Sequence, residues 1–294
     1  MRILITGKDG QLGSELQRSL AGLGDIMATG RQELDLSHPA GIRQLVHSVQ
    51  PDVVLNTAAY NVVDRAESES DLAMQVNGIA PGVLAEECRD IGALLIHFST
   101  DYVFDGKKTT PYLEEDEAAP LSVYGRSKLA GEQAVRAAKG CALIFRTAWL
   151  YSDRRDNFVE TMRRLARQKS ELSVVDDQTG SPTWVRPLSQ ALEKICAQTL
   201  SQKGSAIGEG APVYHATCSG ETTRYGFARA ILDDLANKAP KEAIGRLIPI
   251  SSADYPTPAR RPRYSVLSNA KLERDFGVRL PDWRSAFTQF TSAT

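Results

Sequence analysis

The sequence predicts an α/β protein with a Rossmann-like, doubly wound parallel sheet and a smaller C-terminal α/β lid. Two observations indicate this fold class. Short β-rich runs alternate with longer helical patterns through the first half of the 294 residues, an order typical of parallel strands joined by right-handed crossovers. The β-rich runs are also apolar at consecutive positions, as expected where helices cover both faces of a sheet.

The first half of the chain accounts for most of the predicted sheet. Apolar residues recur at helical spacing at Leu12, Leu16 and Leu20. Ser37 and Pro39 suit the start of a second helix. We expect strands over residues 2–6, 26–29, 52–59, 93–100 and 141–151, and helices from Gln11, after Ser37, over 66–90 with a break near Pro81, and over 124–138.

The pattern becomes less regular after residue 150. We expect a helix over 157–168, a strand and loop over 171–185, a helix over 188–199, a Gly- and Ser-rich loop over 201–212, a strand over 213–217, a helix over 225–236 and a strand over 246–250. The chain is therefore expected to divide into residues 1–150 and residues 151–294, with some later segments returning to the main sheet.

Composition excludes several classes of protein. The net charge of −1 provides no global field for nucleic acid, and no apolar run is long enough to cross a bilayer. The first apolar run is too short for a signal peptide. The four cysteines form no C-x-x-C pair, which favours reduced thiols. We expect a cytoplasmic protein that binds neither nucleic acid nor membrane, either a monomer or a homodimer.

A glycine-rich turn follows the first predicted strand. Gly7, Gly10 and Gly13 separate this strand from the first helix, the context in which a helix N-terminus binds a pyrophosphate. The other interpretation is an ordinary structural turn. After the second strand stands Arg31, which suits a 2′-phosphate and favours NADPH over NADH, although a solvated surface arginine is the alternative. Asp35 suits either an adenine contact or a helix cap.

Tyr124 and Lys128 lie four residues apart on a predicted helix and so share one face. A free tyrosine has a pKa of about 10, and a nearby ammonium lowers it. The strand that ends at Ser99 and Thr100 is predicted to lie beside this helix. The Thr100 hydroxyl is then placed to hydrogen-bond a carbonyl oxygen during reduction. These residues indicate a nicotinamide-dependent carbonyl reductase.

The set of Thr100, Tyr124 and Lys128, with the glycine turn, resembles the extended short-chain dehydrogenase/reductase superfamily. The resemblance is closer still to the dTDP-4-dehydrorhamnose reductase family. It is carried across nearly the whole chain by the segments TGKDGQLGSEL, NTAAYNVVDRAESE, STDYVFDG, YGRSKLAGE, FRTAWLY, DDQTGSPT and YPTPARRPRYSVL. It implies reduction of the 4-keto group of dTDP-4-dehydro-L-rhamnose by NADPH or NADH, giving dTDP-L-rhamnose for surface polysaccharide.

The resemblance also implies roles for individual residues. It places Gly10, Gln11 and Leu12 at the pyrophosphate, Asp35 and Leu36 at the adenine, Ala58, Ala59 and Tyr60 along the cofactor, Thr100 and Asp101 at the sugar, Tyr124 as proton donor, Lys128 at the nicotinamide ribose and Trp149 in the sugar pocket. Residues 1–150 become the dinucleotide-binding domain and residues 151–294 mainly the substrate-binding lid.

Other interpretations remain open at this point. Arg261, within PARRPR, suits either a clamp on the substrate diphosphate or a solvated loop. Some members of the family use Mg²⁺, but the sequence supports no metal site, and Glu15 is expected to be a solvated charge. The rival functions are a nucleotide-sugar epimerase and a non-catalytic, cofactor-binding regulatory subunit of the methionine adenosyltransferase type.

Overall fold

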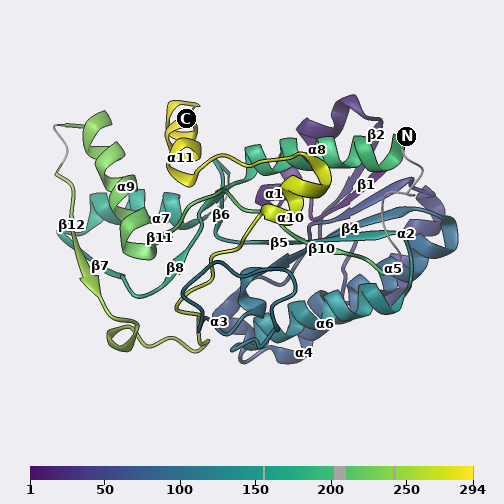
Figure 1. Cartoon of the computed structure of the whole chain (residues 1–294), viewed down its shortest axis with the longest axis horizontal. Coiled ribbons are helices and arrows are strands. Elements are labelled where there is room, and N and C mark those ends of the chain that lie inside the picture. Colours follow the sequence, from purple (N-terminus) through teal and green to yellow (C-terminus); the bar gives the residue numbers. More distant parts are fainter. Residues whose placement is uncertain (155, 202–209, 241–242, 294) are drawn as a thin grey trace.

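The structure is a computed structural model and describes residues 1–154, 156–201, 210–240 and 243–293. A six-stranded sheet crosses the molecule, and every pair of its neighbouring strands is parallel (Figure 1). Its strands in order are β10 (Val213–His215), β5 (Ala142–Thr147), β4 (Leu94–Thr100), β3 (Val53–Asn56), β1 (Arg2–Thr6) and β2 (Asp25–Thr29). The predicted α/β class with a parallel sheet is confirmed.

The order of the strands determines where a ligand binds. The chain passes from β1 to β2 on one side and then continues with β3 on the other side of β1. In a doubly wound sheet, ligands bind beyond the carboxyl ends of the strands at such a reversal. The loops that follow β1, β2 and β3 therefore meet at one edge.

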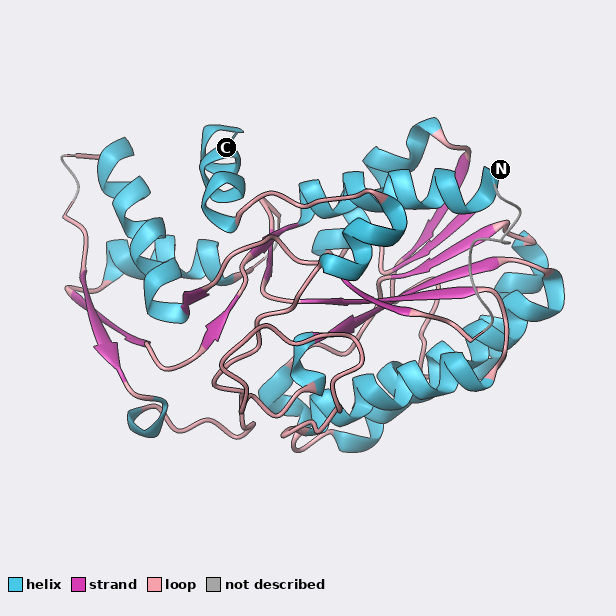
Figure 2. Cartoon of the chain, in the orientation of Figure 1, coloured by secondary structure: helices cyan, strands magenta, loops and turns pink. Residues whose placement is uncertain are grey.

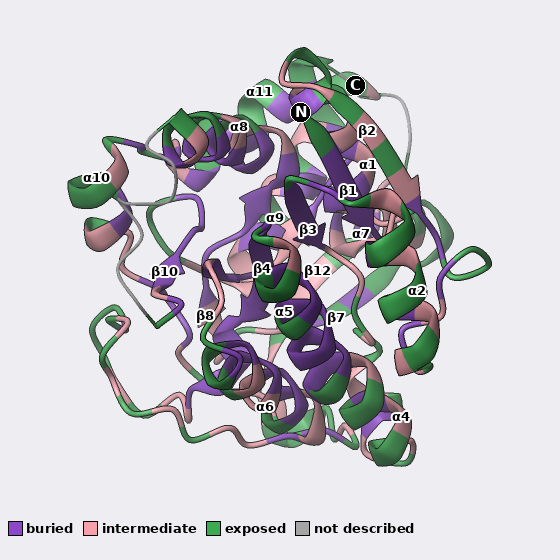
Figure 3. Ribbon diagram, turned by 90° about the vertical axis from the view of Figure 1, so that its right-hand side faces the viewer, coloured by how far each residue is buried: buried purple, intermediate pink, exposed green. Residues whose placement is uncertain are grey.

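Helices cover both faces of the sheet (Figure 2). On one face lie α1 (Gln11–Ser19) and α8 (Val185–Ser201), and on the other α2 (Pro39–Val49), α5 (Ala80–Ile91) and α6 (Val123–Ala137). Successive residues of β1 point to opposite faces, so Ile3 and Ile5 join one hydrophobic cluster and Leu4 joins the other. Figure 3 shows the resulting buried residues along β1, β3 and β4.

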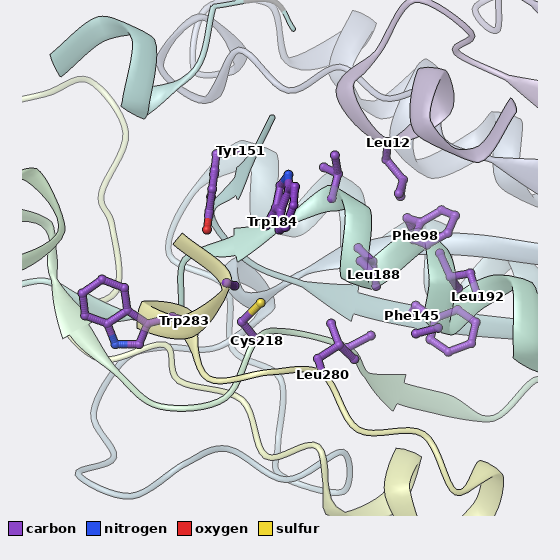
Figure 4. Packing of buried hydrophobic residues seen from close by; sticks show 14 of the residues in the cluster. Leu12, Phe98, Phe145, Tyr151, Trp184, Leu188, Leu192, Cys218, Leu280 and Trp283 are labelled. Atoms are coloured by element: carbon purple, nitrogen blue, oxygen red, sulfur yellow. The ribbon is translucent and has the colours of Figure 1, made fainter. Parts of the chain in front are cut away.

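A smaller α/β region extends from the carboxyl edge of the sheet. Its elements are β6 (Leu150–Tyr151), α7 (Phe158–Gln168), β7 (Glu171–Val175), β8 (Thr179–Gly180), β9 (Thr183–Trp184), β11 (Thr222–Thr223), α9 (Arg224–Lys238), β12 (Arg246–Ile250) and α11 (Trp283–Ala293). Tyr151, Trp184 and Trp283 pack within its core (Figure 4), and this core is continuous with Leu12 and Phe98 of the main sheet region. The smaller C-terminal region is also confirmed.

Three described elements from the second half of the chain lie on the main sheet. Strand β10 pairs with β5, helix α8 packs against α1, and helix α10 (Ala270–Phe276) packs against β10. The division at residue 150 stays a prediction, since one hydrophobic cluster spans both parts. Residues 202–209 of the predicted Gly- and Ser-rich loop lie outside the described residues.

The helix expected over residues 66–90 differs in detail. A short helix, α3 (Val63–Ala66), is separate from α4 (Ser70–Met74), which continues through a π-helix (Gln75–Ile79) directly into α5. Pro81 therefore does not end the helix. Proline lacks an N–H group and its ring crowds the carbonyl four residues earlier, that of Asn77, so the wider π-helical turn before it accommodates both effects.

The contact between this π-helix and α6 is too close for any side chain. A Cβ on Gly131 would lie 2.1 Å from the Asn77 carbonyl oxygen, whereas one on Gly22 would meet no atom within 4 Å. We expect Gly131→Ala to lower the free energy of unfolding in urea by about 1–3 kcal/mol, the usual cost of overpacking. Gly22→Ala is the control and should change it little. Equal stability of the two variants would contradict this prediction.

Candidate active site

The turn between β1 and α1 packs its backbone against the loop that follows β3. Gly7 has a φ of +78°, and a Cβ on it would lie 2.8 Å from the Ala58 nitrogen. A Cβ on Gly13 would lie 2.2 Å from the Gly7 carbonyl oxygen. No side chain caps α1 at Gly10, so the first N–H groups of the helix stay open to an anion. The turn requires glycine for packing and also suits a pyrophosphate.

A cavity of about 330 Å³, here called the glycine-turn cavity, lies at the reversal of strand order. The predicted cofactor residues that line it are Gly7, Gly10, Arg31, Asp35, Leu36, Ala58, Ala59 and Tyr60. They come from the loops after β1, β2 and β3, as the topology requires. Gly13 is buried beneath the turn instead.

Arg31 and Asp35 differ in how they are held. The Arg31 side chain is 78% exposed, with its Nε 3.8 Å from Asp35. The Asp35 carboxylate accepts hydrogen bonds from the Ser37 N–H (2.9 Å) and hydroxyl (2.7 Å), which lower its pKa. Asp35 thus stabilises the turn before α2 but does not cap the helix, because α2 begins after His38 with no side-chain cap, so the expected capping role was wrong. Its contact with adenine stays a prediction.

A second cavity of about 560 Å³, here called the Tyr124 cavity, joins the glycine turn to the end of β4. The predicted residues that line it are Gly10, Gln11, Leu12, Ala58, Ala59, Thr100, Asp101, Tyr124, Lys128 and Trp149. Tyr124 and Lys128 project from α6, whose first turn is capped by the Ser122 hydroxyl. The structure therefore brings the three proposed catalytic residues together.

Burial dominates the charge states of this cavity. The Lys128 ammonium donates a 2.6 Å hydrogen bond to the Phe98 carbonyl oxygen, and burial lowers its pKa to about 8 against the opposing charge of Glu132. Burial also raises the pKa of Tyr124 above its usual value, although the Thr100 hydroxyl opposes this. The expected lowering of the Tyr124 pKa was wrong for the protein chain alone, because desolvation of the phenolate outweighs the hydrogen bond with Thr100.

The indole of Trp149 is held by Gly180 and Arg224, two residues that the sequence analysis did not assign to the site. Trp149 has a φ of +46°. Its indole lies over Gly180, where a Cβ would approach the ring to 2.6 Å. Arg224 is the first residue of α9, and its guanidinium lies 3.7 Å from the centroid of the indole ring. Asp101, nearby, is buried, and its pKa rises to about 6 because burial outweighs the charge of Arg224.

Arg261 does not line the Tyr124 cavity. It lines a third cavity of about 830 Å³, here called the Arg261 cavity, formed mainly by the C-terminal region. Its guanidinium is 2.8 Å from the Asp64 carboxylate, so it is ion-paired and not a free surface charge. Arg224 lines both this cavity and the Tyr124 cavity. Sequence reasoning missed Arg224, because its helix shows no pattern beyond ordinary amphipathicity.

Asn77 is a second residue that the sequence analysis missed. Its amide oxygen accepts a hydrogen bond from the Tyr60 N–H at 2.8 Å. Its amide nitrogen donates to the Tyr60 carbonyl oxygen at 2.8 Å and to the Ser127 hydroxyl at 3.0 Å. It therefore joins the loop after β3 to the helix that carries Tyr124 and Lys128. A polar residue four positions before Pro81, within the predicted helix, is the one signal that pointed to it.

Glu15 was expected to be a solvated charge, and this was wrong. Its side chain is 9% exposed and forms ion pairs with Arg18 and, at 3.3 Å, with Arg186 of α8. The packing of α8 against α1 buries it. In the described ranges no group of three or more histidine, cysteine, aspartate or glutamate residues is placed to hold a metal ion. Within the same ranges no helix has the length and apolar character needed to span a bilayer.

Comparison with known proteins agrees with this arrangement. The family model described as RmlD substrate binding domain matches residues 1–294. A dTDP-4-dehydrorhamnose reductase of Burkholderia thailandensis is 46% identical over 97% of this chain and 96% of the relative. The crystal structure of the Clostridium acetobutylicum reductase has a TM-score of 0.90 at 36% identity and covers 100% of this chain and 99% of that one. The Bacillus anthracis reductase, solved in complex with NADP, has a TM-score of 0.88 at 34% identity, covering 100% and 99%.

The contact between Gly180 and Trp149 leads to a prediction. A methyl group at position 180 would overlap the indole, so Gly180→Ala should displace Trp149 into solvent. Trp184 and Trp283 are buried, so quenching of tryptophan fluorescence by acrylamide reports chiefly on Trp149. We expect stronger quenching in the variant, with Gly22→Ala as the unchanged control. Identical quenching of the two variants would show that the indole is not held by this contact.

Proposed function

This chain belongs to the dTDP-4-dehydrorhamnose reductase family, and from this premise we propose that it reduces dTDP-4-dehydro-L-rhamnose to dTDP-L-rhamnose. One observation carries the proposal. Thr100, Tyr124 and Lys128 line a single cavity that also reaches the glycine turn at Gly10. A proton donor and a carbonyl-binding hydroxyl are thus adjacent to the place where a dinucleotide fits.

An NAD(P)H cofactor fits the residues of the glycine-turn cavity. Gly7 and Gly13 allow the close backbone approach, and the open N-terminus of α1 suits the pyrophosphate. With the pyrophosphate held there, the reduced nicotinamide would lie in the Tyr124 cavity and would supply the hydride that the sugar ketone accepts at C4. We propose that NADPH is preferred, supported by the exposed Arg31 guanidinium at the end of β2, with NADH also accepted.

The residues of α6 and β4 then have distinct tasks. Tyr124 donates its phenolic proton to the C4 oxygen as that oxygen gains negative charge, and burial keeps the phenol protonated near neutral pH. Thr100, at the end of β4, orients the carbonyl oxygen through its hydroxyl. Lys128, held by the Phe98 carbonyl, binds the nicotinamide ribose and places a positive charge beside the developing anion.

We propose that the substrate extends from the Tyr124 cavity into the Arg261 cavity. The sugar then contacts Asp101 and Trp149, and the nucleotide lies among the C-terminal residues. The diphosphate passes Arg224, which lines both cavities, and Arg261 supplies a second guanidinium. A guanidinium fork matches phosphate oxygens well.

We further propose that residues 1–150 bind the dinucleotide and residues 151–294 mainly the substrate. The buried free thiols of Cys88, Cys196 and Cys218 suit the reducing cytoplasm, which supports a cytoplasmic location. The product is proposed to enter rhamnose-containing surface polysaccharide.

The direct test is oxidation of reduced nicotinamide on mixing the protein with dTDP-4-dehydro-L-rhamnose. We expect one NADPH to be consumed per sugar molecule reduced, measured as the loss of absorbance of the reduced nicotinamide. Tyr124→Phe should lower kcat by roughly 100-fold or more, because general acid catalysis is lost while packing is kept. NADH, run separately, should react more slowly.

Other outcomes would exclude the proposal. Tightly retained NAD with no net cofactor consumption would indicate an epimerase. An unaffected biological role in Tyr124→Phe, without any oxidation in the wild type, would indicate a regulatory subunit.

The pKa of Lys128 predicts a pH dependence. Burial lowers this pKa to about 8, so the ammonium loses its proton at a lower pH than an exposed lysine. We expect kcat/KM to fall as the pH rises through about 8, since kcat/KM reports groups of the free enzyme. Lys128→Arg keeps its charge at high pH, so its kcat/KM should not fall as the pH rises through about 8, even if the variant is slower overall. If kcat/KM of Lys128→Arg still falls over this pH range, the fall must come from the titration of another group.

A further inference from the structure

At the end of β2, the carboxylate of Glu33 accepts hydrogen bonds from two donors that could also bind an anionic ligand. Glu33 Oε1 accepts from the Lys8 ammonium, and Glu33 Oε2 accepts from the Gly30 backbone N–H at 2.8 Å. Lys8 belongs to the glycine turn and Glu33 to the turn after β2, so the pair joins the two loops. An ammonium and a backbone N–H directed at one anion are also the donors that phosphate oxygens use.

This ion pair lies where the adenosine ribose of a dinucleotide is expected. Gly30 and Arg31 line the glycine-turn cavity directly after β2, the strand whose end contacts the ribose 2′ position in this type of fold. A Cβ on Gly30 would lie 3.1 Å from Glu33 Oε2, 3.3 Å from Lys8 Cε and 2.4 Å from Asp9 Oδ2. Three charged side chains therefore converge on one point of the cavity rim.

Carboxylates outnumber cations around this point. Lys8 and Arg31 are positive, Asp9 and Glu33 are negative, and Arg31 is itself 3.8 Å from the Asp35 carboxylate. Hydrogen bonds from Lys8 and Gly30 lower the pKa of Glu33, so it is ionised at neutral pH. A 2′-phosphate would meet two carboxylates and find the Lys8 and Gly30 donors already engaged. A 2′-hydroxyl would instead find a carboxylate that accepts its hydrogen bond.

We propose that Glu33 competes with the cofactor's 2′-phosphate for Lys8 and the Gly30 N–H, and so limits the preference for NADPH over NADH. The inference rests on the proposed function, because it requires a nicotinamide dinucleotide in the glycine-turn cavity. With NADH, Glu33 accepts the ribose 2′-hydroxyl. With NADPH, Glu33 turns outward and Lys8 binds the phosphate together with Arg31. The exchange is feasible because both partners are partly exposed and such pairs are weak.

The test is binding of NADP⁺ and NAD⁺ to the whole chain, measured by isothermal titration calorimetry without any sugar. Glu33→Gln should bind NADP⁺ roughly two- to fivefold more tightly, the size of one exposed charge interaction, and NAD⁺ no more tightly than the wild type. Lys8→Met should weaken NADP⁺ by a similar factor and leave NAD⁺ nearly unchanged. The ratio of the two dissociation constants is the readout, so a general change in stability does not imitate it.

The matched control is Glu171→Gln, which removes an exposed carboxylate 2.9 Å from Arg246 on the C-terminal region. It should leave both dissociation constants unchanged. Unaltered or weaker NADP⁺ binding in Glu33→Gln would overturn the inference while the proposed function stands. Wild-type protein that binds neither dinucleotide would overturn both. Loss of affinity for both dinucleotides alike in Lys8→Met would show that Lys8 contacts the shared part of the cofactor.

Discussion

The hydrogen bond from the Lys128 ammonium to the Phe98 carbonyl determines the geometry on which the rest of the site depends. It ties α6 to β4 at 2.6 Å, and so places Tyr124 of the helix beside Thr100 of the strand end. A buried charge is stable only when it is paired and hydrogen-bonded. One helical turn further, the carboxylate of Glu132 supplies opposite charge and is itself held by Arg146 at 2.7 and 2.9 Å.

The same helix is connected to the loop after β3 by Asn77. Its amide satisfies the Tyr60 backbone and the Ser127 hydroxyl at once, so the loop after β3 and the helix with Tyr124 hold a common position. The π-helical turn is what brings Asn77 to this place, and the absence of a side chain at Gly131 is what lets α6 approach it. The loop after β3 and the proposed proton donor are thus coupled through packing, as the proposed hydride transfer requires.

On the substrate side, the C-terminal region contributes through contacts and not through its own catalytic group. Trp149 follows β5 but is held by Gly180 and Arg224 from later segments. The positive charge of Arg224 also favours the ionised form of the buried Asp101, and Arg224 lines two cavities. The proposed sugar pocket therefore exists only when both halves of the chain are packed together around their shared hydrophobic cluster.

The sequence by itself determined the parallel α/β fold, the glycine turn and the placement of Tyr124 and Lys128 on one helical face. These features depend on local periodicity, backbone freedom and spacing, which neighbouring residues encode. Only the tertiary structure decided the ion pairs of Glu15 and Glu33, the π-helix at Asn77, the place of Arg224 and the raised pKa of Tyr124. Each of these depends on burial or on a partner distant in the sequence, and no local pattern specifies which distant side chain arrives there.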